Sequence, residues 1–218
     1  MPRLLFEKKG NAVWISHLDL MRLFQRSFKR AGLLLKHSQG YNPRPYVAVA
    51  LPLSVGVESH CELLDFDLEG DPVSNEQILS GLNHALTEGI RVLNVYEEGR
   101  KIKHLAYLDC VVTLLYDNGI PAGAREKIEQ LFRQEQLVVS KKSKNGPSEQ
   151  DIIPMIRELE VREEYNRILL CARVCCQNPS LNPMQLSAAV ARYLPQYTAD
   201  HVKSCRVEIY DTEEKVFR

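Results

Sequence analysis

The chain has 218 residues, of which 44% are hydrophobic and 26% are charged, and its formal net charge is zero. This composition is typical of globular domains, and the length fits one large domain or two small ones. No run of about 18 apolar residues occurs, so no membrane-spanning helix is expected. The charged N-terminal stretch lacks the apolar core of a signal peptide, and we therefore expect a cytoplasmic protein.

The zero net charge conceals an uneven distribution along the chain. Residues 1–50 hold nine Lys and Arg against two Asp and Glu (9 − 2 = +7), whereas residues 51–100 hold two against ten (2 − 10 = −8). A surface built from the first block would be basic and suited to an anionic partner such as RNA. Folding can instead bring the two blocks together, so that their charges pair.

Strand and helix patterns alternate in the first hundred residues. The helix over 16–31 has Ser16 as its capping residue and Gly32 as its stop signal. The full order is a strand at 3–8, the helix at 16–31, a strand at 33–38, an extended segment at 46–53, a strand at 61–69, a helix at 74–89 and a strand at 90–98.

The same order recurs in the second half. It runs as a strand at 106–116, a helix at 121–135, a strand at 137–142, a polar loop at 143–150, an additional piece at 151–164, a strand at 166–176, a helix at 182–194 and a strand at 203–211. The sequence therefore predicts an α+β protein of two tandem ferredoxin-like (β-α-β-β-α-β) domains, 1–98 and 104–218, joined by a linker. The piece at 151–164 is expected to add an edge hairpin to the second domain.

One face of the first predicted helix is basic. Arg22, Arg26, Lys29 and Arg30 recur three or four residues apart, which places them on one side of a helix, where they can neutralise phosphates. The alternative is an ordinary solvated helix face. His17 lies in the first turn, where the helix dipole favours the neutral imidazole, so it is a candidate general base or a side chain that only packs locally.

The segment 37–59 combines turn residues with side chains that can hold a ligand. Gly40 supplies backbone freedom, and Pro43 and Pro45 fix φ on both sides of Arg44, whose guanidinium is then presented at low entropic cost. A structural loop is the alternative, although a turn alone does not require this set of polar side chains. The candidate binding residues are His17, Arg22 and Arg26 on the helix and Gln39, Tyr41, Asn42 and Arg44 in the segment.

Cofactor and metal motifs are absent from the sequence. The clustered cysteines Cys171, Cys175 and Cys176 have no C-x-x-C pair and no neighbouring histidine pair, so we expect reduced thiols on a strand and no metal site. Phosphate-loop, dinucleotide, zinc-protease and hydrolase-elbow signatures are missing. The cluster-binding run C-x-x-x-C-x-x-C of radical SAM enzymes is missing as well, and we expect no cofactor.

Three segments within residues 16–59 carry a family resemblance. "SHLDLMRLFQRSFKRAGL", "SQGYNPRP" and "LPLSVGVES" resemble the hallmark segments of the radical-SAM-linked family of unknown function, whereas beyond about residue 100 "IIPMIRELE" is the best match. Members of that family occur as separate bacterial proteins or as C-terminal parts of chains that carry a radical SAM domain. The resemblance implies a helper or substrate-binding module with a radical SAM protein as its partner, acting near RNA.

Three functions remain open at this point. The first is a non-catalytic accessory module that binds a radical SAM enzyme and presents RNA or another anionic substrate to it. The second is a metal-independent RNA endonuclease with His17 as general base and Arg44 as phosphate clamp, although the last strand, "SCRVEIYD", lacks the glycine-rich loop of the endonucleases with this layout. The third is a protein-interaction scaffold whose charge blocks pair internally.

Overall fold

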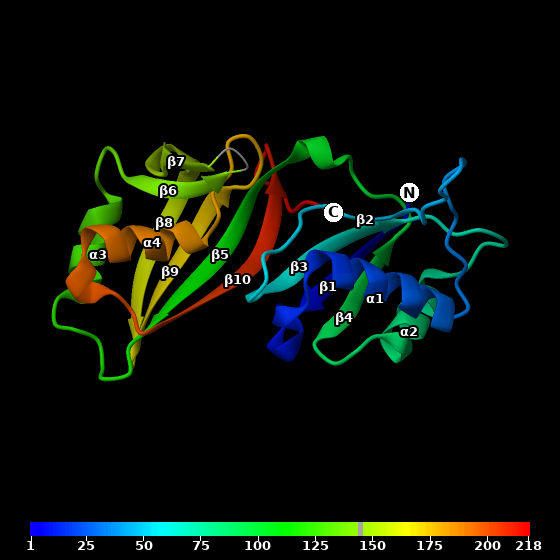
Figure 1. Cartoon of the computed structure of the whole chain (residues 1–218), viewed down its shortest axis with the longest axis horizontal. Coiled ribbons are helices and arrows are strands. Elements are labelled where there is room, and N and C mark those ends of the chain that lie inside the picture. The colour runs from blue at the N-terminus through cyan, green and yellow to red at the C-terminus, as the bar shows by residue number, and fades with distance from the viewer. Residues whose placement is uncertain (144–145) are drawn as a thin grey trace. The chain divides into compact units, whose positions relative to one another are not determined.

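The chain folds into two compact units. The computed structural model describes residues 1–143 and 146–218, with Met1–His104 and Phe217–Arg218 in unit 1 and Leu105–Val216 in unit 2 (Figure 1). Both units combine an antiparallel sheet with two helices, so the protein is of the mixed α/β kind. Among the described residues, no helix is both long enough and apolar enough to cross a membrane.

Unit 1 is a four-stranded sheet covered on one face by two helices (Figure 1). Its strands lie side by side in the order β4-β1-β3-β2, and each adjacent pair is antiparallel. In chain order the elements are β1 (Arg3–Lys8), the 3₁₀ turn η1 (Gly10–Trp14), α1 (His17–Arg30), β2 (Val47–Val49), β3 (Val57–Phe66), α2 (Asn75–Ala85), β4 (Ile90–Tyr96) and the 3₁₀ turn η2 (Ile102–His104).

Apolar side chains from α1 and the sheet make the core of unit 1. The Phe6 ring on β1 meets Phe24 edge-on at a centroid distance of 4.8 Å, and Phe28 lies 5.1 Å from Phe66 on β3. The predicted cap is present, because Ser16 Oγ accepts a hydrogen bond from the backbone N–H of Asp19. These contacts fix the face of α1 that is buried and hence the face that meets solvent.

The strand predicted at 33–38 is wrong as a sheet member. Leu33 and Leu35 are buried and Leu34 is exposed, so the side chains alternate as in a strand. The backbone, however, makes only isolated bridges, from Leu35 to Leu68 and from His37 to Pro45. The place beside β3 belongs to β2 instead, because alternation reports which side chains are buried and not which backbone groups pair.

The last two residues of the chain complete unit 1. The Phe217 ring is fully buried, with the guanidinium carbons of Arg3 and Arg100 5.4 and 5.5 Å from its centroid. The Arg100 N–H donates to the carbonyl of Arg218. A Cβ atom at Gly99 would lie 2.5 Å from Arg3 Nε, so a larger residue there would displace the buried Arg3 guanidinium. No sequence pattern indicated that the C-terminus belongs to the first unit.

Unit 2 is built around strands in the order β10-β5-β9-β8. Buried and half-buried residues alternate along β5 and β9, which leaves one sheet face half open. In chain order the elements are β5 (Leu105–Leu115), α3 (Ala124–Phe132), β6 (Val138–Ser143), β7 (Gly146–Asp151), the 3₁₀ turn η3 (Ile153–Met155), β8 (Ile156–Glu164), β9 (Arg167–Cys175), α4 (Met184–Tyr193), the 3₁₀ turn η4 (Pro195–Tyr197) and β10 (His201–Asp211).

Of the piece at 151–164, which was expected to add an edge hairpin, residues 156–164 form the edge strand β8 paired with β9, and a further hairpin precedes it. Strands β6 and β7 pair with each other in a separate two-stranded sheet, and β8 is the edge strand beside β9. The prediction of a loop over 143–150 is wrong where β7 forms, and its residues 144–145 lie outside the described residues. The strand predicted at 137–142 is present as β6, whose Val139 is buried. The strand β7 is held by polar contacts, such as Gln150 Nε2 donating to Gln185 Oε1 on α4 at 3.0 Å, so apolar alternation gave no signal for β7.

Candidate functional site

The most prominent surface feature of unit 1 is the segment that joins α1 to β2, which we name the arm (residues 36–46). Its two sides are tied by hydrogen bonds from the Ser38 N–H to the Arg44 carbonyl (2.8 Å) and from the Tyr46 N–H to the Lys36 carbonyl (2.8 Å). Gly40 near its tip has φ of 130°, a conformation that favours glycine. The arm is therefore a narrow hairpin with a defined backbone.

The predicted residues of the arm all face solvent. Gln39, Tyr41, Asn42 and Arg44 are exposed, and the Tyr41 side chain is 100% exposed. Ser38, which sequence reasoning missed, fixes Arg44 from both sides: its Oγ accepts the Arg44 N–H at 3.0 Å and its own N–H binds the Arg44 carbonyl. The backbone of Arg44 is thus held while its guanidinium projects outward.

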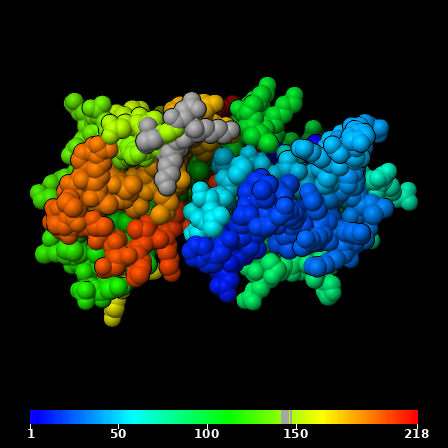
Figure 2. All heavy atoms as spheres, in the orientation of Figure 1, coloured from blue at the N-terminus to red at the C-terminus, as the bar shows by residue number. Residues whose placement is uncertain are grey.

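A row of exposed cations runs along α1. This basic row consists of Arg22, Arg26, Lys29 and Arg30. Asp19 pairs with Arg22 at 3.0 Å, and hydrogen bonds from Ser16 and then Arg22 hold the pKa of the Asp19 carboxyl below its usual range. Within the described part of the chain, the other three members form no salt bridge. Figure 2 shows the blue atoms of α1 and the arm at the surface of unit 1.

The acidic block after residue 50 cancels only part of the basic block. Asp65 on β3 pairs with Arg3, and Asp67 pairs with Lys36 at the base of the arm at 3.4 Å. Beside the arm, a hollow of about 590 Å³ is lined on its other side by Leu68, Glu69 and Gly70. Among the described residues, the exposed basic side chains of residues 1–50 that form no salt bridge are Arg26, Lys29 and Arg30 on α1 and Arg44 in the arm.

His17 lies far from Arg44. It is the first residue of α1, which follows the end of β1 that pairs with Ser59, whereas the arm precedes β2 at the opposite end of the sheet, where Val47 pairs with Phe66. A helix of 14 residues is about 20 Å long. The structure therefore groups the predicted residues of the arm with one another and the arginines of α1 with one another. The proposed general base, His17, and the proposed phosphate clamp, Arg44, are separated by the length of the helix.

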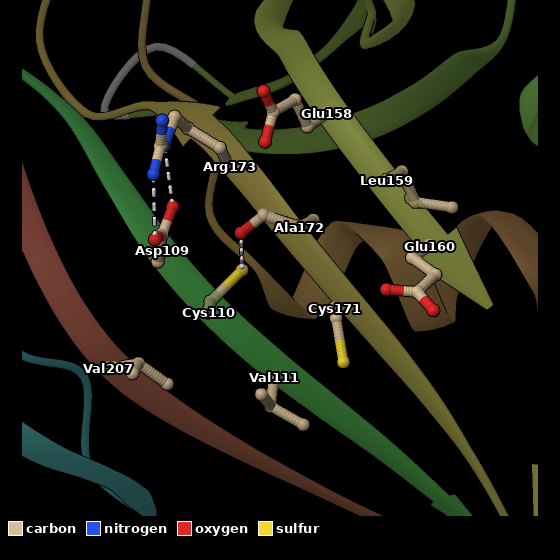
Figure 3. A pocket seen from close by; sticks show the side chains of 10 residues that line it. All are labelled: Asp109, Cys110, Val111, Glu158, Leu159, Glu160, Cys171, Ala172, Arg173 and Val207. Atoms are coloured by element: carbon tan, nitrogen blue, oxygen red, sulfur yellow. Dashed lines mark hydrogen bonds and ion pairs between the residues drawn. The ribbon is translucent and has the colours of Figure 1, made fainter. Parts of the chain in front are cut away.

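The open sheet face of unit 2 holds a second hollow, of about 330 Å³ (Figure 3). Arg173 on β9 donates to both carboxylate oxygens of Asp109 on β5 (2.8 and 3.0 Å) and to Glu214 at 3.2 Å. Its guanidinium also stacks 4.1 Å from the ring centroid of Tyr210, whose hydroxyl donates to Asp109. These charges satisfy one another, which leaves the arginine no free donor fork for an anion.

The thiols of this hollow are not activated. Cys171 shares the open face with Arg173 and Cys175, and burial raises the pKa of the Cys171 thiol. Burial raises the pKa of Cys110, whose Sγ donates to the Ala172 carbonyl, to about 12. Both thiols stay protonated at neutral pH and are poor nucleophiles. Among the described residues, no group of three or more His, Cys, Asp and Glu side chains is arranged to hold a metal ion.

Comparison with solved structures shows a shared fold. A chain in the "Crystal Structure of a Cbf5-Nop10-Gar1 Complex" has a TM-score of 0.54 at 10% identity, with 95% of this chain and 48% of that chain covered. A chain of the archaeal box H/ACA sRNP Nop10-Cbf5 complex has a TM-score of 0.47 at 10% identity, with 94% and 46% covered. This chain thus spans about half the length of those chains, and the likeness to the first of them concerns the fold alone.

Comparison by sequence gives a family. No curated protein matches the chain. Residues 2–183 match the model of a family described as an uncharacterized protein conserved in bacteria, DUF2344. Because the match covers both the arm and α1 and far more than half of the sequence, the chain belongs to this bacterial family.

Proposed function

We propose that this chain is a non-catalytic accessory module that holds RNA, or a similar phosphate-bearing substrate, on unit 1 for a radical SAM enzyme. The observation that carries the RNA part is the exposed arrangement of the basic row beside an arm whose backbone is fixed. Cations along a helix neutralise successive phosphates, and a constrained arginine binds a phosphate at low entropic cost. The radical SAM partner rests on the resemblance of the segments within 16–59.

We also interpret each unit as a variant of the ferredoxin-like sandwich. Both units have the element order β-α-β-β-α-β once the β6–β7 hairpin is set aside. In both sheets the strands of this motif lie in the order fourth, first, third, second. Helices on one face of such a sheet leave side chains on helix surfaces and connections free for binding. In unit 1 those positions are α1 and the arm.

The endonuclease is the weaker candidate. A general base and a phosphate clamp must act on the same phosphodiester, and general catalysis needs the base within hydrogen-bond reach of its proton. His17 begins α1, whereas Arg44 lies in the arm that follows the other end of the helix. A scaffold whose charges pair internally is also less favoured, because Arg26, Lys29 and Arg30 form no salt bridge within the described residues.

The phosphate contacts can be tested by the salt dependence of RNA binding. We expect Arg26→Ala and Arg44→Ala each to weaken the binding of fluorescein-labelled RNA regardless of its sequence. Each should flatten the plot of log Kd against log salt by about 0.7 to 1, since one phosphate contact is lost. Fluorescence anisotropy between low and moderate salt measures this slope. Arg167→Ala, which removes an exposed arginine of unit 2 paired with Glu164, is the matched control.

Three results would overturn the proposal in whole or in part. Wild-type protein that shows no salt-dependent RNA binding at low ionic strength removes its RNA part. Reproducible metal-independent RNA cleavage that disappears in His17→Ala replaces the helper with the endonuclease, because a general base typically contributes about 10²–10⁴ in rate. For the partner, we expect the tagged chain to co-purify a radical SAM protein from its own cells, and recovery of other proteins alone would remove that part.

A further inference from the structure

The only tryptophan of the chain stands at the surface of unit 1. Trp14 ends the η1 turn just before α1, and its side chain is 71% exposed. One side of its ring rests on Gly56, where a Cβ atom would lie 3.4 Å from Trp14 Cζ3. The indole therefore packs against Gly56 on one side, and most of its remaining surface is open to solvent.

The backbone on both sides of Trp14 is fixed. Lys8, which is buried, donates from Nζ to the carbonyls of Val13 (3.2 Å) and Ile15 (2.8 Å). The N–H of Gly56 donates to the same Val13 carbonyl at 2.9 Å. A buried ammonium has a large desolvation cost and is retained here by these carbonyls. The indole is therefore preorganised, which lowers the entropic cost of stacking on it.

The exposed face of α1 leads from Trp14 to the arm. Leu18, Arg22, Arg26 and Arg30 are exposed and follow one another four residues apart, so that each is the surface neighbour of the next. Trp14 precedes the helix at its N-terminal end, and the arm with the exposed Tyr41 follows the helix at its C-terminal end. Aromatic rings at both ends of a line of cations are the pattern of single-strand binding, in which bases stack and phosphates pair.

We propose that Trp14 is a stacking platform for an unpaired base of single-stranded RNA whose backbone follows the basic row. This inference rests on the proposed function and adds the strandedness of the ligand and the residue that reads it. Only unpaired bases expose their faces for stacking, so duplex RNA would lose this contact. A protein partner covering Trp14 and Leu18 is the other occupant, but the neighbouring cations favour a polyanion.

The chain's single tryptophan makes the test direct. We expect a labelled oligouridylate dodecamer to quench Trp14 fluorescence in step with the rise in anisotropy, and a duplex of the same length to leave the fluorescence unchanged. Trp14→Ala should weaken dodecamer binding about five- to one-hundred-fold. The salt slope should stay that of wild type, because stacking involves no counterion release, whereas Arg26→Ala flattens the slope. Trp14→Phe keeps a ring and should retain most of the affinity.

The outcomes separate this inference from the proposed function. Tyr165→Ala, at an exposed aromatic residue of unit 2, is the matched control and should lose little affinity. Salt-dependent binding of the dodecamer that leaves Trp14 fluorescence unchanged and is unaffected by Trp14→Ala overturns the stacking platform but keeps the RNA site. Quenching by a co-purified protein and not by RNA assigns the surface to a protein partner and also overturns it. Absence of any RNA binding removes both.

Discussion

Asp65→Ala should destabilise unit 1 by about 3–5 kcal/mol, because it leaves a buried guanidinium without its counterion. Arg3 is only 1% exposed, and its Nε and Nη2 donate to the two Asp65 oxygens at 2.6 and 2.9 Å. Its Nη1 already lacks a hydrogen-bond partner among the described residues. Urea unfolding measures the loss of stability. Hydrogen exchange of the β1 and β3 amides assigns that loss to unit 1.

The chain offers a matched control two residues away. Asp67 pairs with Lys36, both partners are more exposed, and the separation is 3.4 Å, so Asp67→Ala should cost less than about 1 kcal/mol. The double variant Arg3→Met, Asp65→Leu should recover most of the stability, since removing both charges also removes their desolvation cost. Equal effects of Asp65→Ala and Asp67→Ala would contradict a buried ion pair.

The helices of the protein could be predicted closely from the sequence. Ser16 caps α1 as predicted and Ser74 caps α2, because a capping hydroxyl acts within its own turn. Leu33 and Leu35 misled the prediction, because their burial is satisfied without strand pairing. The strand β7 was missed because its contact to α4, from Gln150 to Gln185, is polar, and polar contacts leave no periodic signal.

The candidate site was partly predictable, for a related reason. The spacing of Arg22 and Arg26 alone places them on one exposed face, and the prolines around Arg44 indicate a fixed loop. Trp14 lies in a turn between two elements, so it belongs to no periodic pattern. The sequence shows only that it is the single tryptophan of the chain. The support from Lys8 was hidden entirely, because a lysine at the end of a strand pattern is ordinarily a solvated residue.

Phe217→Ala should destabilise unit 1 by about 3–5 kcal/mol, although the residue is the penultimate one of the chain. Its ring is 0% exposed and lies between the guanidinium groups of Arg3 and Arg100, so truncation leaves a cavity and uncovers the buried Arg3–Asp65 pair. Val216→Ala, at a neighbour that is 48% exposed, is the control and should change stability by less than about 0.5 kcal/mol. Hydrogen exchange should show faster opening of β1 and β4 with β9 unchanged.

Because Phe217 and Asp65 both touch Arg3, their double variant should lose less stability than the sum of the two single losses. A chain shortened by its last two residues that keeps wild-type protection in β1 would show that unit 1 closes without them.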